Sequence, residues 1–276
     1  MQNQITFSII ISTCEKYSDL WDINFELFHK HWPDCPANVY LLTDSPTDRS
    51  FEGVEIIAAG EGTEITERLA KALEMIRTEY VLFILEDHFL IKPIDNSDFE
   101  KALRFMKEYH MDYTRLYTAS KHYLRREGAV RCEAYPDFYF RNLDKGDYKV
   151  SLYPGLWSAD FMRKTLKERL NAWQYEVSLT PLARELNAKC AICNRDILPI
   201  LDVICKGKLF HKANRYLKHN GYELPSRELI GRKEEIRILG AKKLRHIMPL
   251  GLIRKTKKAL SKKGFQFYSD SDSLKG

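Results

Sequence analysis

Two adjacent carboxylates and a histidine, Glu86, Asp87 and His88, directly follow the apolar run from Tyr80 to Leu85. Such a run is typical of a strand that is buried on both faces of a mostly parallel sheet. Open α/β sheets bind their ligands beyond the carboxyl ends of these strands. Adjacent carboxylates repel each other unless a positive charge joins them, and a divalent cation is the usual partner. The stretch therefore predicts a metal or ligand site, and the alternative is an ordinary solvated strand end.

The elements that must position this site are predicted by hydrophobic periodicity. Strands are expected at 7–12, 39–43, 54–58 and 80–85, and helices with apolar stripes at 20–28, 65–76 and from 97 onward. Ser18 or Asp19 is expected to cap the first helix and Ser97 the third. Alternating strands and helices over the first 110 residues predict an α/β fold with a Rossmann-like, mostly parallel sheet flanked by helices.

The rest of the chain is less regular. Short strands and loops are expected over 111–160, a helix over 161–170, and a second helix that begins at Pro181. Strands are expected at 189–193 and 197–205, and helices at 209–219 and after 223. Typical dinucleotide, P-loop and serine-hydrolase motifs (G-x-G-x-x-G, G-x-x-x-x-G-K-[ST] and G-x-S-x-G) are absent from the sequence, which argues against those three classes.

Composition favours a soluble globular protein. The chain has 276 residues, of which 44% are hydrophobic and 30% charged. Neither a membrane-spanning run nor a signal peptide is apparent, so we expect a cytoplasmic protein. Six cysteines are present, and Cys190 and Cys193 form a C-x-x-C pair without a second pair at zinc-site spacing. We interpret this pair as reduced core thiols rather than as a metal or redox site.

The positive charge is concentrated near the C-terminus. The net charge is +6, and the stretch 232–263 has twelve Lys/Arg against Glu234 and Glu235, so it carries +10 and the remainder −4. Apolar residues alternate with these cations, which favours peripheral contact of 240–263 with an anionic membrane at its inner face. The alternative is a solvated helix. No nucleic-acid module is recognisable, so no nucleic-acid partner is expected, and residues 269–276 are expected to be disordered.

Several motifs in order along the chain carry a family resemblance. They are the opening strand Ser8 to Cys14, the strand end Leu42-Thr43-Asp44, the Glu86-Asp87-His88 stretch, Pro154-Gly155-Leu156-Trp157, and Trp173-x-x-Glu176. Over roughly residues 5–205 the chain resembles the GT-A class of nucleotide-sugar-dependent glycosyltransferases, in particular bacterial enzymes that build capsule and lipopolysaccharide. The resemblance implies a GT-A catalytic domain over 1–225, with a nucleotide-binding half at 1–110, an acceptor half at 111–225, and a basic helical extension at 226–276.

The resemblance implies transfer of a sugar from a nucleotide sugar, most simply a UDP-sugar, to a saccharide or lipid-linked acceptor, with inversion. It assigns nucleotide-sugar binding to Thr13, Asp44, Arg68, Glu86 and Asp87. Lys206 and Lys208 follow a predicted strand, where they could offset charge on the departing diphosphate. The alternatives are a turn-forming role for Asp44, a solvated helix face for Arg68, and plain surface positions for the two lysines.

The family's metal motif is usually D-x-D, and here it reads Glu-Asp-His. Asp87 and His88 are the implied metal ligands, and histidine suits Mn²⁺ better than Mg²⁺. A metal-independent site is the alternative.

On the acceptor side, the resemblance implies Glu176 as the catalytic base and Trp157 and Trp173 as acceptor-binding residues. Trp173 and Tyr175 flank Glu176 and could desolvate it or stack on a sugar ring. The alternatives are a helix-start carboxylate for Glu176 and a core position for Trp157.

Two other functions stay open. A nucleotidyltransferase would normally carry a glycine-rich, arginine-containing loop after the first strand, and Thr13-Cys14-Glu15-Lys16 has no glycine. The third possibility is a non-catalytic GT-A-like domain that binds a membrane or a partner through its basic tail.

Overall fold

The computed structural model describes residues 6–116, 118–144 and 146–247. The strands of its central sheet are β1 (Phe7–Ser12), β2 (Asn38–Thr43), β3 (Val54–Ala58), β4 (Tyr80–Leu85), β6 (Tyr113–Leu116), β7 (Val130–Arg131), β8 (Phe138–Phe140), β9 (Gly155–Ser158) and β10 (Cys190–Cys193). Within those ranges their order is β3-β2-β1-β4-β9-β6-β10-β8-β7. Only β9 and β8 run opposite to the other described strands of this sheet. The predicted α/β fold class with a Rossmann-like, mostly parallel sheet is confirmed.

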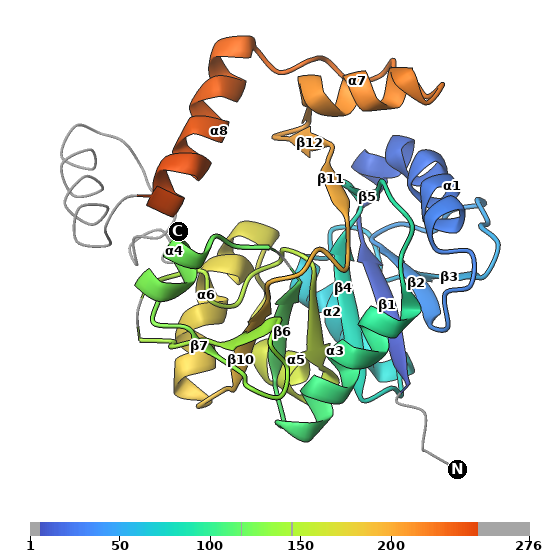
Figure 1. Cartoon of the computed structure of the whole chain (residues 1–276). Coiled ribbons are helices and arrows are strands. Elements are labelled where there is room, and N and C mark those ends of the chain that lie inside the picture. Colours follow the sequence, from blue (N-terminus) through green and yellow to red (C-terminus); the bar gives the residue numbers. More distant parts are fainter. Residues whose placement is uncertain (1–5, 117, 145, 248–276) are drawn as a thin grey trace.

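Helices cover both faces of the sheet (Figure 1). They are η1 (Glu15–Leu20), α1 (Trp21–His31), α2 (Ile65–Met75), α3 (Asn96–Glu108), α4 (Lys121–Arg126), α5 (Ala159–Thr165) and α6 (Ala172–Glu185). Side chains alternate along a strand, so Ile9 and Ile11 join the hydrophobic cluster beneath α1 and α3, whereas Ile10 joins the cluster beneath α2, α5 and α6. The two buried faces explain why the strand sequences are almost continuously apolar.

The parallel register decides where the site lies. Ser12 at the end of β1 pairs with Leu42 of β2 on one side and Leu85 of β4 on the other. The residues that follow these strands therefore emerge at one edge of the sheet, and they include Thr13, Asp44 and Glu86.

Several local predictions are wrong because neighbouring groups compete for the same roles. A 3-10 helix precedes α1, and neither Ser18 nor Asp19 caps that helix. Asp95 caps α3 by accepting from the backbone N–H of Ser97. Pro181 lies inside α6 rather than at a helix start, because an Asn171 capping box begins this helix ten residues earlier. The helix expected over 161–170 is α5, which ends at Thr165.

The C-terminal segment packs at the carboxyl edge of the sheet (Figure 1). It contains β11 (Ile200–Asp202), the hairpin of β12 (Ile204–Cys205) and β13 (Lys208–Leu209), and the helices α7 (His211–His219) and α8 (Arg232–Ile247). Strand β11 pairs with β5 (His88–Leu90), which directly follows the acidic residues after β4. Leu20 and Leu27 share a hydrophobic cluster with Leu217 and Ile230, which lie on either side of the expected domain boundary at residue 225. Residues on both sides of that boundary therefore pack against the N-terminal part of the chain.

Within the basic extension, the helix α8 begins at Arg232 and continues to Ile247, where the description ends. Most of the stretch 240–263 and the terminus expected to be disordered lie outside the described residues. Within the described part of the chain, no helix combines the length and the apolar character that crossing a membrane requires.

Candidate functional site

The loops after β1 and β2 form one side of the site. The Oδ1 atom of Asp44 accepts a hydrogen bond of 2.8 Å from the backbone N–H of Glu15, and it also accepts from the Thr43 hydroxyl at 3.3 Å. Asp44 thereby ties the start of η1 to the end of β2. Thr13 is buried, and its hydroxyl accepts a 2.9 Å hydrogen bond from the indole of Trp21. The side chains of Asp44 and Thr13 therefore stabilise the conformation of the loops after β1 and β2.

Arg68 lies in the second turn of α2, close enough to the strand ends for its charge to lower the pKa values of Cys14 and Glu86. One of its terminal nitrogens donates to the carbonyl of Thr63, whereas its buried Nε–H has no hydrogen-bond partner among the described residues. Burial raises the pKa of the nearby Cys14 thiol, the carboxylates of Glu86 and Asp44 raise it further, and the Arg68 charge lowers it. Arg68 therefore belongs to the strand-end site and retains an unused donor.

The acidic stretch follows β4 directly. The backbone N–H of Glu86 bonds to Ser12, and the side-chain amide of Asn24 donates to the Glu86 carbonyl at 2.8 Å. Burial and the neighbouring Asp87 charge raise the pKa of Glu86 above its usual range, while Arg68 and Arg227 lower it. A raised carboxyl pKa beside a second carboxylate indicates a place where positive charge is favourable.

His88 brings a second carboxylate to this acidic end. It is buried in β5, where it pairs with Asp202 of β11. Its Nδ1 accepts from the backbone N–H of Leu85, and its Nε2 lies 3.6 Å from Asp202 Oδ1 and 3.9 Å from Asp87 Oδ1. Because Nδ1 accepts, Nε2 carries the proton in the neutral ring. The Nε2 atom of His88 therefore lies between the carboxylates of Asp87 and Asp202.

These donors can be tested against the implied metal. Carboxylate oxygens suit Mn²⁺ and Mg²⁺, and imidazole suits Mn²⁺. Among the described residues, no group of three or more His, Cys, Asp or Glu side chains is arranged to hold a metal ion on its own. The carboxylates of Asp87 and Asp202 therefore fit a cation that a ligand's phosphates would help to hold, whereas His88, with Nδ1 accepting and Nε2 carrying the proton, offers no lone pair to a metal in this arrangement.

Arg227 is a site neighbour that the sequence did not reveal. Its guanidinium forms two hydrogen bonds with Asp19, donates to the carbonyls of Lys16 and Gly207, and lies 4.8 Å from the ring centroid of Tyr17. More than 200 residues separate Arg227 from Asp19, so no local pattern could predict the contact. The contact attaches the C-terminal segment to η1, beside the acidic stretch.

Glu176 lies in the second turn of α6, so it is not the helix-start carboxylate of the alternative interpretation. Its Oε1 accepts a 3.2 Å hydrogen bond from the backbone N–H of Leu152. The next residue, Tyr153, has its ring 5.2 Å from that of His88 and its hydroxyl 3.5 Å from Asp202 Oδ1. The loop before β9 therefore connects Glu176 to the acidic end of β4.

The aromatic residues near Glu176 divide into exposed and buried. Trp173 is 59% exposed. Tyr175 is fully buried and bonds to the Thr165 hydroxyl, so it cannot stack on a sugar. Trp157 is fully buried against Tyr113, as its core interpretation describes, and has no surface for an acceptor in this structure.

Lys206 and Lys208 both belong to the β12–β13 hairpin. Lys206 occupies its exposed turn, with a φ of 53°. Lys208 forms an exposed ion pair of 3.3 Å with Glu228. The donation from Arg227 to Gly207 places the hairpin near η1, because Arg227 also pairs with Asp19 of η1.

The cysteine pair lies within β10, where Cys190 and Cys193 are buried, and both are free thiols. Burial raises the pKa of each thiol to about 12. Their location agrees with the interpretation as core residues.

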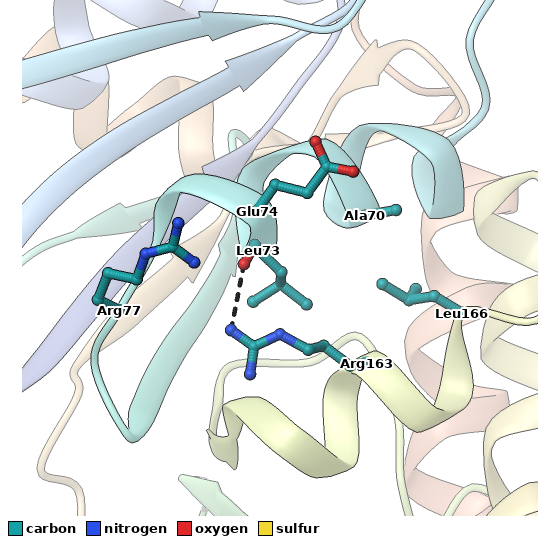
Figure 2. Close-up of a pocket in the computed structure, with 6 residues that line it drawn as sticks. All are labelled: Ala70, Leu73, Glu74, Arg77, Arg163 and Leu166. Carbon is teal, nitrogen blue, oxygen red and sulfur yellow. Dashed lines mark hydrogen bonds between the residues drawn. The ribbon is translucent and has the colours of Figure 1, made fainter.

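Two hollows among the described residues lie away from the strand-end site. One of about 350 Å³ is formed by the C-terminal half of α2 and by α5 (Figure 2). There Arg163 donates to the carbonyl oxygens of Leu73 and Ile76, which otherwise lack helical partners. Another, of about 510 Å³, lies along β2 and β3. Neither hollow is lined by the strand-end residues Asp44, Arg68, Glu86 or Asp87. The candidate site is therefore identified by the side chains that meet at the strand ends, not by a cavity.

Comparison with known proteins gives similarity at the level of three-dimensional structure. No protein-family model matches the chain, and the comparison with curated proteins gives no match. A mannosyltransferase from Pyrobaculum calidifontis in complex with GDP-Man and Mn²⁺ is 9% identical, with a TM-score of 0.49 over 75% of this chain and 59% of its own. The mannosyl-3-phosphoglycerate synthase from Rubrobacter xylanophilus is 12% identical, with a TM-score of 0.44 over 68% of this chain and 65% of its own.

A CMP:2-keto-3-deoxy-manno-octonic acid synthetase complexed with CTP is 14% identical, with a TM-score of 0.43 over 68% of this chain and 88% of its own. This chain thus spans most of the synthetase but less than two thirds of the mannosyltransferase and of the mannosyl-3-phosphoglycerate synthase. All three TM-scores lie below 0.5, and the functional conclusions that follow depend on the residues of this chain.

Proposed function

We propose that the protein is a GT-A glycosyltransferase that moves a sugar from a nucleotide sugar to a saccharide or lipid-linked acceptor. The observation that carries the proposal is the convergence of Asp44, Arg68, Glu86 and Asp87 at the carboxyl edge of the sheet, with Arg68 keeping a buried donor unused. This is where open α/β sheets bind nucleotides. The resemblance of the sequence motifs to bacterial surface-polysaccharide enzymes supports the same function.

The donor would lie across the loops after β1, β2 and β4. Breaking a glycosyl–phosphate bond places negative charge on the departing diphosphate, and positive groups at that position accelerate the reaction. Arg68 offers its Nε–H there. A divalent cation held by Asp87 and Asp202 together with the diphosphate would supply further charge stabilisation.

Glu176 is the proposed base. Its carboxylate accepts a hydrogen bond from the backbone N–H of Leu152. The next residue, Tyr153, borders the acidic end of β4 through its contact with His88. A carboxylate at this position can take the proton of an acceptor hydroxyl as that hydroxyl attacks the sugar. One base and direct attack give inversion. Trp173, exposed in the first turn of the same helix, offers a ring on which an acceptor sugar can stack.

Donor binding is the first test. Calorimetry with UDP, GDP, CMP and their sugars, each with Mn²⁺, Mg²⁺ or EDTA, should show one preferred nucleotide. Arg68→Gln should weaken that binding by about tenfold, the loss of one charged hydrogen bond. Arg77→Gln is the matched control, since Arg77 is exposed just beyond the far end of α2.

The variants separate the proposed roles. Asp87→Asn should abolish the metal-dependent part of the affinity, and binding that EDTA leaves unchanged would remove the metal role. Glu176→Gln should retain nucleotide binding and lose transfer. Release of pyrophosphate from a nucleoside triphosphate would favour a nucleotidyltransferase instead. If the folded protein bound no nucleotide, the remaining function would be that of a non-catalytic domain that binds a membrane or a partner.

The nature of the acceptor bears on location. A lipid-linked acceptor is consistent with contact of the 240–263 stretch with the inner face of the cytoplasmic membrane, and most of that stretch lies outside the described residues. Flotation of the full chain with anionic and neutral vesicles, compared with a chain that ends at residue 247, tests this part of the proposal.

A further inference from the structure

The first two turns of helix α8 expose apolar side chains and turn an acidic one inward. Glu235 is buried, and its carboxylate accepts a 3.1 Å hydrogen bond from the backbone N–H of His211 at the start of α7. Ile236, by contrast, is 70% exposed and Leu239 is 49% exposed. A surface helix normally turns its apolar side toward the core and its charged side toward water. At these positions α8 therefore shows the reverse arrangement.

The other exposed side chains between residues 232 and 239 are positively charged. They are those of Arg232, Lys233 and Arg237, and the guanidinium of Arg237 also lies 4.0 Å from the partly buried carboxylate three residues before it. Arg232, Ile236 and Leu239 are spaced by four and then three residues, so they share one side of the helix. That side therefore combines two apolar side chains with a cation.

Exposed apolar side chains are concentrated in this part of the chain. Six large hydrophobic side chains of the described residues are exposed, and three of them lie between residues 229 and 239: Leu229, Ile236 and Leu239. Single exposed apolar side chains are ordinary on a protein surface. Ile236 and Leu239 are neighbours on one helix, however, so they form a shared apolar surface.

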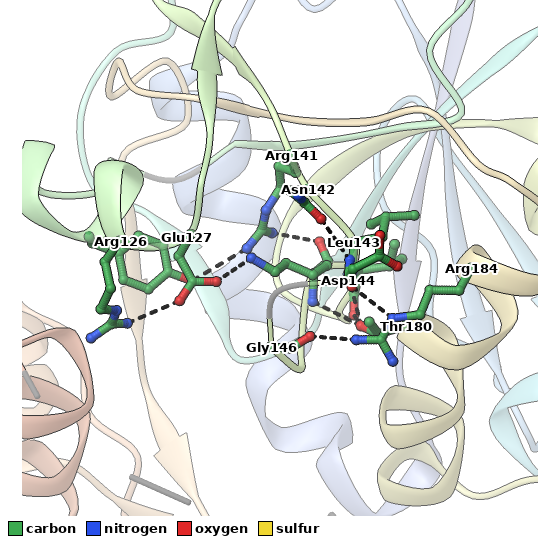
Figure 3. Close-up of polar contacts among 12 residues, drawn as sticks. Arg126, Glu127, Arg141, Asn142, Leu143, Asp144, Gly146, Thr180 and Arg184 are labelled. Carbon is green, nitrogen blue, oxygen red and sulfur yellow. Dashed lines mark hydrogen bonds and ion pairs between the residues drawn. The ribbon is translucent and has the colours of Figure 1, made fainter. Parts of the chain in front are cut away.

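Two sets of contacts hold α8 in place. Ile238 packs against the hydrophobic cluster to which α7 contributes, and α8 also lies beside α4 (Figure 1). The residue after α4, Glu127, forms a buried ion pair with Lys149 (Figure 3), which fixes the end of α4 to the body of the protein. Because α8 is already folded and docked, presenting its exposed side to a partner requires little ordering.

We propose that the docking face, defined as Arg232, Lys233, Ile236, Arg237 and Leu239, binds the surface of an anionic phospholipid membrane. Charge decides the kind of partner, since residues 232–263 contain twelve Lys/Arg against two glutamates. Cations are attracted to anionic headgroups, and apolar side chains among them enter the boundary between headgroups and acyl chains. A second copy of the chain is a poorer partner, because the same face would bring like charges together.

The docking face lies before the 240–263 stretch, and its binding does not depend on the transferase activity. The proposed function enters only through the acceptor, which would be lipid-linked if the enzyme works at a membrane. Vesicle binding and nucleotide binding are therefore measured on the same samples.

The experiment is co-sedimentation of the full chain with vesicles of phosphatidylcholine, with and without phosphatidylglycerol. The variants are Ile236→Ser and Leu239→Ser. Met75→Ser is the matched control, because Met75 lies on α2 and is 47% exposed, close to the value for Leu239. Lys233→Gln tests the charge, and Lys107→Gln is its control on α3, where Lys107 is also exposed. Circular dichroism confirms that each variant is folded.

The wild type should bind the vesicles that contain phosphatidylglycerol more tightly than those of phosphatidylcholine alone. Ile236→Ser and Leu239→Ser should each weaken the binding by about tenfold, from the loss of a buried apolar side chain. Lys233→Gln should weaken it by about fivefold, and the two controls should leave it unchanged. The residues after 247 are the same in every variant, so these differences report α8 alone.

Equal vesicle binding by Leu239→Ser and Met75→Ser, or no vesicle binding by the wild type, would overturn the inference. Ultracentrifugation without lipid adds a second check, since a dimer that Leu239→Ser dissociates would assign the face to a second copy instead. Vesicle binding that depends on Leu239 without any nucleotide binding would sink the transferase and keep the docking face. Nucleotide binding without such vesicle binding would sink only the docking face.

Discussion

Replacing Arg227 by methionine should destabilise the protein far more than the same change at Arg49. Both arginines pair with an aspartate near the start of α1 and lie over an aromatic ring, Tyr17 at 4.8 Å for Arg227 and Trp21 at 5.6 Å for Arg49. They differ in burial. The side chains of the Arg227–Asp19 pair are 10% and 26% exposed, whereas those of the Arg49–Asp22 pair are 40% and 71% exposed.

The magnitude follows from the contacts. Arg227 forms a two-bonded ion pair with Asp19, for which removal of one partner in a largely buried pair costs on the order of 3 kcal/mol. An exposed pair contributes about 0 to 1 kcal/mol. Methionine keeps much of the apolar volume of either side chain, so the difference reports the charge interactions. We expect Arg227→Met to lose about 3 kcal/mol and Arg49→Met less than about 1 kcal/mol.

Urea unfolding followed by circular dichroism measures both values, and the pH dependence adds a second test. Burial raises the pKa of Asp19, but hydrogen bonds from Arg227 and Ser226 outweigh it and hold the pKa below its usual range. A lowered carboxyl pKa contributes stability that is fully present above the unfolded value of about 3.9 and is lost as the pH falls through the folded value. The difference in free energy of unfolding between the wild type and Arg227→Met should therefore become smaller below about pH 4.

Equal losses of stability in the two variants would refute the reasoning, since burial would then not govern the strength of these pairs. A large loss for Arg227→Met that does not diminish in acid would also contradict it, because the effect would then come from packing. Asp19→Asn, which keeps the size of the side chain, separates these cases.

Three further predictions concern the acceptor half. Gly155→Ala should destabilise by about 1 to 3 kcal/mol in urea unfolding, because an added Cβ would lie 2.8 Å from the Tyr113 ring and 3.1 Å from a backbone oxygen. Thr180→Val should cost about 2 to 4 kcal/mol, since the Thr180 hydroxyl accepts from the buried backbone N–H groups of Lys149 and Val150; Thr180→Ser, which keeps the hydroxyl, should cost much less. Burial lowers the pKa of Lys149 to about 8, so at this residue the unfolded chain binds more protons from about pH 8 to about pH 10.4, and the contribution of Lys149 to stability should rise with pH over that window. Lys149→Met should remove up to about 1.4 kcal/mol per pH unit of that rise, and an unchanged slope would show that Lys149 is not the titrating group.

Sequence reasoning was most successful where the signal is local. The six consecutive apolar residues from Tyr80 to Leu85 favour a strand that is buried on both faces of a parallel sheet. The carboxylates that follow them were therefore expected at a strand end. The positions of helix starts were less predictable. Ser97 looked like a cap, yet Asp95 took that role, because two polar residues so close in sequence can compete for the same backbone N–H.

Residue type alone could not place the aromatic residues. Trp157, Trp173 and Tyr175 have similar rings in neighbouring motifs, but Trp157 and Tyr175 are buried and Trp173 is exposed. Their burial depends on which neighbours pack against β9 and α6, and that information is spread over the whole chain.

The sequence by itself determined the α/β class, the parallel strands and the acidic end of β4, since periodicity and strand length act over a few residues. Only the tertiary structure decided that Asp202 lies beside His88, that Arg227 pairs with Asp19, and that Arg115 lies over the ring of Tyr153. Each of these contacts joins segments far apart in the chain. Their free energy depends on distance in space and on burial, and neither quantity is written in the local order of residues.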